Sequence, residues 1–173
     1  MGQPFPPICR EPLPNVILER MRKTTPLGIA AGLLCGCSLL ASAQDKGPWR
    51  ATSSNATAIT GDIGIFDGKL SLNFATFTLA EIRKLDPAEA AALFSSETTA
   101  PGGGFLYRMD IPATKHFVHK NTLCGSEDTQ WMATWLQGRD LHVAFFSGGK
   151  TPVMTSDALA NSTDVCGLFL YSR

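Results

Sequence analysis

The residues whose side chains are best suited to metal binding or catalysis lie between positions 116 and 128. His116 and His119 form an H-x-x-H pair, and Glu127 and Asp128 are adjacent carboxylates that follow Ser126. Two imidazoles at this spacing share one face of a helix, which is the arrangement a zinc site needs. Paired carboxylates can act as acid and base where their surroundings separate their pKa values. Metal binding and hydrolysis are therefore the two chemistries to weigh first.

The local sequence favours a plainer interpretation of these residues. Pro112 precedes the histidines, no glutamate lies between them, and on a strand two rings at this spacing point to opposite faces. We therefore expect no metal site and no cofactor. Adjacent carboxylates rarely converge on one substrate atom, so we expect an exposed polar loop that serves as a recognition surface. A hydrolase in which Glu127 or Asp128 pairs with His119 remains the alternative.

Two tryptophans follow this loop. Trp131 and Trp135 are four residues apart and would share one face of a strand. Such rings can stack on a ligand, although core packing is their usual role. We assign no catalytic residue. The candidate binding residues are His116, His119, Ser126, Glu127, Asp128, Trp131 and Trp135.

A second start of the chain is visible at Met21. Two basic residues follow it, and residues 27–40 form an uncharged apolar run. A helix of that length spans about 21 Å, short of the roughly 30 Å hydrocarbon core of a bilayer. A small-x-small site then ends at Ala43. These features predict a secretory signal peptide over residues 21–43, cleaved between Ala43 and Gln44.

Two further features of the leader leave alternatives open. Residues 1–20 are rich in proline, which excludes a helix, and we interpret them as an upstream extension outside the fold or as an over-long n-region. Leu34-Cys35-Gly36-Cys37 resembles a lipobox. Lipidation of Cys37 would make the protein an envelope lipoprotein anchored to the membrane. Cleavage after Ala43 would instead discard Cys37.

Residues 44–173 are enough for one domain. Fifteen Lys and Arg balance fifteen Asp and Glu over the whole chain, and four of the former and two of the latter precede residue 44. The remaining charge is therefore −2, with no basic stripe. This composition argues against nucleic acid and against an anionic membrane surface as partners.

Of the five cysteines, only Cys124 and Cys166 follow the predicted cleavage point. An even pair in an exported chain predicts a disulfide. Their wide separation argues against a reactive pair, because redox dithiols use close spacing such as C-x-x-C.

Alternating apolar residues predict strands along most of the domain. The clearest hairpin covers residues 62–73, where apolar residues alternate on both sides of Asp67-Gly68, the strongest short hairpin signal. In this pattern Phe74 continues the apolar face of Leu70 and Leu72. Further strands are predicted over residues 105–111, 129–136, 141–147 and 166–171, and a segment at residues 49–60 is expected to end in a strand.

One helix interrupts the strands. Asp86 at the N-cap, Pro87 at the first helical position and Glu89 at the third make a capping box, which predicts a helix from Pro87 to Ser95. Apolar residues at spacing three over residues 79–85 leave room for a helical turn before it.

Several predicted strands, such as HVAFF and CGLFLY, are apolar on both faces. In an antiparallel protein this implies burial on both sides. We therefore predict a mainly β fold, an antiparallel sandwich or small barrel of about six to eight strands with one short helix and one disulfide.

The runs NTLCGSEDTQWMATW and DVCGLFLYSR, with LHVAFFSGGKTPV between them, resemble a family of small exported bacterial proteins of unknown function. Its members also carry segments similar to ITGDI, FTLAEIRKL and LYRMDIP, so the resemblance covers most of residues 49–173. It implies a compact secreted domain and lends no catalytic residue.

Together these features predict an exported domain, secreted or periplasmic, that acts by binding in the manner of an inhibitor or a ligand binder. The expected partner is a protein or small molecule in the envelope or outside the cell, and membrane contact is expected only if Cys37 is lipidated. Because a fold does not fix a function, the hydrolase and the envelope lipoprotein remain alternatives.

Overall fold

The computed structural model describes residues 45–95 and 102–173. The predicted upstream extension, the signal peptide with its cleavage bond, and Cys37 lie outside these residues. The strands are β1 (Gly47–Ala51), β2 (Ile63–Phe66), β3 (Lys69–Leu72), β4 (Ala75–Lys84), β5 (Gly102–Gly103), β6 (Phe105–Ile111), β7 (Thr129–Gln137), β8 (Asp140–Phe146) and β9 (Val165–Ser172). The helical segments are η1 (Ala56–Thr60), α1 (Pro87–Phe94), η2 (Val118–Lys120) and α2 (Ser156–Ala160).

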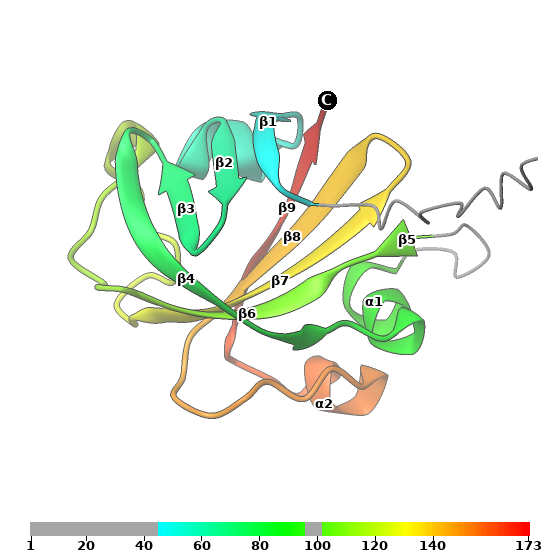
Figure 1. Ribbon diagram of the computed structural model, residues 1–173. Helices are drawn as coiled ribbons and strands as arrows, with labels where there is room; N and C mark the ends of the chain where they lie inside the picture. The colour runs from blue at the N-terminus through cyan, green and yellow to red at the C-terminus, as the bar shows by residue number, and fades with distance from the viewer. Residues whose placement is uncertain (1–44, 96–101) are drawn as a thin grey trace, which may run out of the picture. The chain divides into compact units, whose positions relative to one another are not determined.

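Eight of the strands close into an antiparallel barrel (Figure 1). Each barrel strand pairs with the next one along the chain, and β1 pairs with β9 to complete the ring. The short strand β5 is an addition that pairs with β7 alone. The predicted mainly β antiparallel fold is confirmed, in its barrel form.

The pairing that closes the ring is short. Arg50 pairs with Ser172 and Ala51 with Tyr171, whereas the first half of β1 pairs only with β2. In the described residues, Gly47–Trp49 therefore have a strand partner on one side and none on the other. This gap in the ladder shapes the surface described below.

Two tight turns connect β2, β3 and β4. Phe66 pairs with Lys69 across Asp67-Gly68, which confirms the predicted hairpin. Leu72 pairs with Ala75 across a second two-residue turn, in which Asn73 and Phe74 have φ of 42° and 65°. The expectation that Phe74 continues the apolar strand face is wrong, because the backbone reverses at this residue and its side chain is fully exposed (103%).

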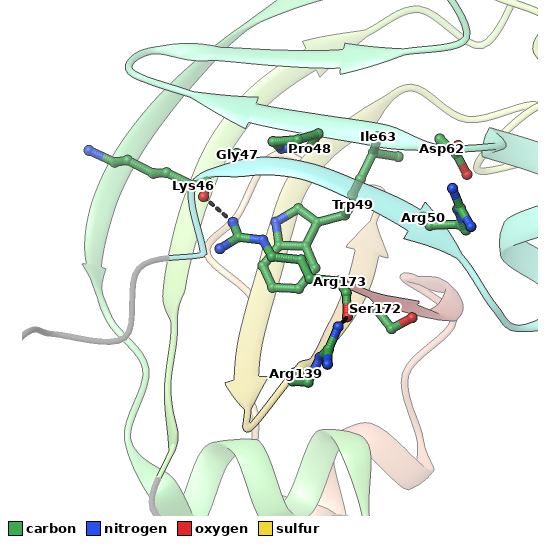
Figure 2. Close-up of a pocket in the computed structure, with 10 residues that line it drawn as sticks. All are labelled: Lys46, Gly47, Pro48, Trp49, Arg50, Asp62, Ile63, Arg139, Ser172 and Arg173. Atoms are coloured by element: carbon green, nitrogen blue, oxygen red, sulfur yellow. Dashed lines mark hydrogen bonds between the residues drawn. The ribbon is translucent and has the colours of Figure 1, made fainter.

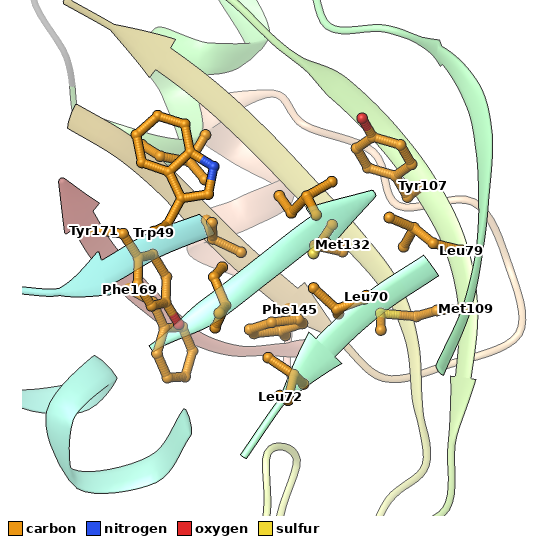
Figure 3. Packing of buried hydrophobic residues seen from close by; sticks show 14 of the residues in the cluster. Trp49, Leu70, Leu72, Leu79, Tyr107, Met109, Met132, Phe145, Phe169 and Tyr171 are labelled. Carbon is orange, nitrogen blue, oxygen red and sulfur yellow. The ribbon is translucent and has the colours of Figure 1, made fainter. Parts of the chain in front are cut away.

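The inside of the barrel is occupied by apolar side chains (Figure 3). Phe145 and Phe169 meet edge to face with ring centroids 5.2 Å apart. Each fully buried side chain of this size contributes about 1.5–3 kcal/mol, so this interior cluster is the main source of stability. Its large members include Trp49, Leu70, Leu72, Leu79, Tyr107, Met109, Met132, Phe145, Phe169 and Tyr171.

A second apolar cluster lies on the outer face of β6, β7 and β8. The helices α1 and α2 lie together beside these strands (Figure 1) and cover it. This explains why HVAFF is apolar on both faces, as the prediction of a barrel partly covered by a helix requires. The outer cluster comprises Leu85, Ala90, Leu93, Leu106, Trp131, Ala133, Trp135, Ala144, Phe146 and Met154.

The helix α1 forms where its capping residues predict it. The backbone N–H of Asp86 donates to Glu89, 3.1 Å away, and Pro87 opens the helix. Arg83 holds the same carboxylate through two hydrogen bonds of 2.6 and 2.7 Å. This contact lowers the pKa of Glu89. No helix of the described residues is long and apolar enough to cross a bilayer.

The predicted disulfide is present. Cys124, in the loop before β7, is bonded to Cys166 at the start of β9, with Cα atoms 4.8 Å apart. Both cysteines pack against the interior cluster. The bond therefore ties the β6–β7 loop to the strand that closes the barrel.

Two local predictions are wrong. Residues 49–60 were expected to end in a strand, but the strand comes first, in β1, and residues 56–60 form the single helical turn η1. Residues 79–85 contain no helical turn, because residues 79–84 continue β4, where the register shifts between Glu81 and Arg83. The three apolar residues do not share one face: Leu79 lies in the interior cluster, Ile82 is half-exposed, and Leu85 lies in the outer cluster.

Candidate binding site

The loop between β6 and β7 carries five of the seven candidate residues predicted from the sequence. Phe117 and Leu123 are buried in the interior cluster and hold this loop against the barrel. The five candidates on this loop have exposed side chains. They are His116, His119, Ser126, Glu127 and Asp128.

The loop is held closed by one of the carboxylates. Oδ1 of Asp128 accepts a hydrogen bond of 2.8 Å from the backbone N–H of Ala113. Within the described residues no hydrogen bond or ion pair joins His119 to Glu127 or Asp128. The same residues contain no group of three or more His, Cys, Asp or Glu arranged to hold a metal ion. Asp128 thus has a structural contact, and the hydrolase pairing stays a prediction.

The two tryptophans lie apart from that loop surface, on β7. Trp131 and Trp135 are 6% and 5% exposed in the outer cluster, beneath the segments that carry α1 and α2. The guanidinium of Arg108 lies 4.8 Å from the centre of the Trp131 ring. Their ring faces are therefore in contact with other parts of this chain, and they do not line the same surface as the loop residues.

A cleft lies away from this loop, beside the short β1–β9 pairing. It is a cleft of about 880 Å³ formed by the chain from Lys46 through β1, the start of β2, the β7–β8 turn and the end of β9 (Figure 2). It opens beside the half of β1 that has no second strand partner. We call it the cationic cleft, and its lining residues are Lys46, Gly47, Pro48, Trp49, Arg50, Asp62, Ile63, Arg139, Ser172 and Arg173.

Arg173 and Trp49 form one wall of the cationic cleft. The Arg173 guanidinium lies 3.8 Å from the centre of the Trp49 ring and donates to the carbonyl oxygen of Lys46 (Figure 2). Gly47, at φ 119°, leaves room for this approach, because a Cβ there would lie 2.8 Å from Arg173 Nη2. The arginine thus caps part of the backbone that β9 leaves unpaired.

Positive charge dominates the lining. Four cationic side chains, those of Lys46, Arg50, Arg139 and Arg173, line the cleft with a single acidic side chain, that of Asp62. Arg139 donates through Nε and Nη2 to the carbonyl oxygen of Arg173. Arg50 makes no side-chain hydrogen bond or ion pair with any described residue. Because each guanidinium has five N–H donors, Arg50 and Arg139 keep donors for a ligand.

One cation is partly neutralised from outside the cleft. Lys46 forms an ion pair with Asp67 in the β2–β3 turn, and this contact raises the pKa of Lys46. The acid inside the cleft is also engaged, since Asp62 Oδ1 accepts a hydrogen bond of 2.9 Å from the backbone N–H of Ala51. The arginines therefore carry most of the unpaired charge.

No family model, curated protein or solved structure matches this chain. The resemblance to a family of exported bacterial proteins accordingly stays a prediction, and the case for a function has to come from the geometry of the site.

A buried acid, Asp45, holds the Trp49 wall of the cleft in place. Asp45 is 1% exposed, and its backbone carbonyl accepts a hydrogen bond of 2.6 Å from the indole N–H of Trp49. Its Oδ2 accepts from Tyr107, 2.9 Å away, and from Thr134, 2.6 Å away. Trp49 is therefore held in place by the residues that precede β1, which presents its ring to Arg173.

Sequence reasoning missed the cationic cleft. Its cations lie at positions 46, 50, 139 and 173, so no motif or spacing joins them. The signal that could have found them is the pairing of β1 with β9, because closing the ring brings these positions together. The sequence predicted either a sandwich or a barrel, and the pairing of β1 with β9 can be expected only for the barrel.

Proposed function

We propose that this domain is an exported binding protein whose cationic cleft takes an acidic ligand. The observation that carries the proposal is the convergence of four cations on one cleft of about 880 Å³ in a domain with no net positive charge. A binding role agrees with the prediction made from the sequence. The proposed binding surface, however, is the cationic cleft and not the β6–β7 loop.

The chemistry of arginine favours carboxylate ligands. A guanidinium matches a carboxylate in a paired, two-bond geometry, and such charge-assisted bonds are stronger than neutral ones. Single exposed ion pairs contribute little, but several cations around one concave surface raise the local potential and attract an acidic partner. The two arginines with unused donors, Arg50 and Arg139, are the residues expected to contact the ligand.

Export is part of the proposal. A disulfide between Cys124 and Cys166 is typical of proteins in an oxidising compartment, which supports a secreted or periplasmic location. The acidic ligand would then be met outside the cytoplasm, as a small molecule or as part of another protein.

The test is a binding titration with a labelled oligoglutamate peptide, using an oligoserine peptide as the uncharged comparison. The purified protein, with its disulfide formed, should bind oligoglutamate more tightly, and the affinity should fall as salt is added. Replacing both arginines, Arg50→Gln with Arg139→Gln, should weaken binding about tenfold or more.

The matched control removes two exposed cations that do not line the cleft, through Lys120→Gln with Lys150→Gln. Both double variants lose the same charge, so an equal loss of affinity in the two would mean that net charge and not the cleft is responsible. That outcome, or equal affinity of the wild type for the two peptides, would overturn the proposal. Arg139 also bonds the Arg173 carbonyl, so thermal unfolding of each variant should show that the fold is kept.

A further inference from the structure

A second hollow adjoins the cationic cleft. It measures about 470 Å³, lies over the outer face of β2 and β3, and is lined by Phe66 and Phe74 among others. Pro48, Asp62 and Ile63 line both hollows, so the two meet along the β1–β2 strand pair. We call the second hollow the aromatic groove.

The aromatic groove has aromatic sides and a glycine beneath one of them. The ring of Phe66, which is half-exposed (50%), lies over Gly64, where a Cβ would be 2.5 Å from the ring. Gly64 is therefore needed for Phe66 to lie flat against the sheet. Phe66 and Phe74 both expose apolar surface to solvent beside this groove.

Phe74 stands out because its backbone is unfavourable as well. A two-residue turn with positive φ at both positions favours glycine at the second, and a bulky side chain there is disfavoured. Phe74 nevertheless occupies it at φ 65° with its ring fully in solvent. An exposed aromatic residue held in a disfavoured conformation gains nothing for the fold of this chain, which points to a contact outside it.

We propose that the aromatic groove and the cationic cleft form one composite surface. It binds an acidic segment of a partner protein in which an aromatic or large aliphatic residue lies next to carboxylates. The inference rests on the proposed function, since it takes the cleft as the site of the carboxylates. Charge complementarity selects the acidic residues, and Phe66 and Phe74 take the apolar one, in the way that aromatic anchors dominate protein interfaces.

A protein segment suits this surface better than an anionic membrane does. Asp62 lies where the two hollows meet, and its charge would repel a continuous layer of anionic headgroups. A peptide can instead place a backbone N–H or a neutral side chain at that point. The surface is also hollowed, which fits a side chain entering it rather than a flat lipid layer.

The experiment compares two labelled peptides made of glutamate and serine, one with a central phenylalanine and one with serine in its place. The wild-type protein should bind the phenylalanine peptide about tenfold more tightly. Phe74→Ser should remove that difference and leave the affinity for the serine peptide unchanged. Val153→Ser is the matched control, because Val153 is also an exposed apolar residue (64%) and lines neither hollow.

The outcomes separate the inference from the proposed function. If both peptides bind equally, and Arg50→Gln with Arg139→Gln weakens both, the cationic cleft stands and the composite surface is wrong. If neither peptide binds, both proposals fail. If the protein binds phosphatidylglycerol vesicles in a way that depends on Phe74, while the two peptides bind alike, the occupant is a membrane and the inference is overturned.

Discussion

The hydroxyl of Tyr107 lies 2.9 Å from a carboxylate oxygen of Asp45, 62 residues earlier in the chain. Thr134 donates to the same oxygen, whereas Oδ1 of Asp45 has no hydrogen-bond partner in the described residues. The buried acid therefore depends on two hydroxyls, one from β6 and one from β7. These contacts fix the chain just before β1, on which the cationic cleft is built.

Replacing Tyr107 by Phe should destabilise the protein by about 1.5–3 kcal/mol, because it removes a hydrogen bond to a buried acid that has few others. Tyr171→Phe is the matched control. It breaks a neutral hydroxyl pair with Thr60, 2.7 Å away, and should cost only about 0.5–1.5 kcal/mol. Urea denaturation of the two variants gives the comparison. An equal or smaller loss for Tyr107→Phe would contradict the role assigned to Asp45.

The chain has two tyrosines, and both should resist ionisation while the protein is folded. Burial raises the pKa of both, and the Asp45 carboxylate adds to the effect at Tyr107. An unfolded tyrosine ionises near pH 10, so the folded state keeps its full stability below about pH 10 and loses it as the pH rises further. Phenolate absorbance should therefore appear only together with loss of the circular dichroism signal. Gradual ionisation centred near pH 10 in protein that stays folded would count against this.

The disulfide should contribute strongly to stability. Its two cysteines are 42 residues apart in sequence, so replacing both, Cys124→Ala with Cys166→Ala, should lower the free energy of unfolding by about 2–5 kcal/mol. Wild-type protein that has been reduced should unfold at the same denaturant concentration as the variant. If the reduced wild type kept its full stability, the bond would not be the source of the effect.

The mature chain should begin at Gln44. Asp45 is buried beside β6 and β7, two residues after the predicted signal peptide ends at Ala43. Intact mass of the exported protein should match residues 44–173. A mass that corresponds to a diacylated Cys37 would instead establish a lipoprotein.

The parts of the fold that depend on local patterns were predictable. The hairpin at Asp67-Gly68 and the capping box at Asp86 are set by residues within a few positions of each other, and both are present. The disulfide was predictable for a different reason, since only two cysteines follow the predicted cleavage point. None of these three predictions requires knowing which distant strands pair with each other.

The turn at Asn73-Phe74 shows where local reasoning fails. Alternation alone predicts that Phe74 lies on the apolar face. A turn of this kind usually has glycine at its second position. Here phenylalanine occupies it, so the sequence carries the opposite signal. The residue that breaks the local rule is also the one that borders the aromatic groove.

The cleft itself could not be read from the sequence, because its arginines come from distant segments that meet only when the ring closes. Arg50 pairs with Ser172 in the finished barrel, and Arg139 contacts the Arg173 carbonyl. The candidates chosen from the sequence shared a short stretch of chain instead. Proximity along the chain placed them in one loop, but it gave no information on where cations from distant segments converge.

The pairing of β1 with β9 also sets the order of events as the chain folds. The first strand has to wait for the last one before the barrel wall can be completed, so the domain cannot finish folding until its final segment is available. The same final segment brings Cys166 and Arg173. The cross-link and the cationic cleft are therefore both completed only when this last strand is in place, and a chain that lacks it has neither.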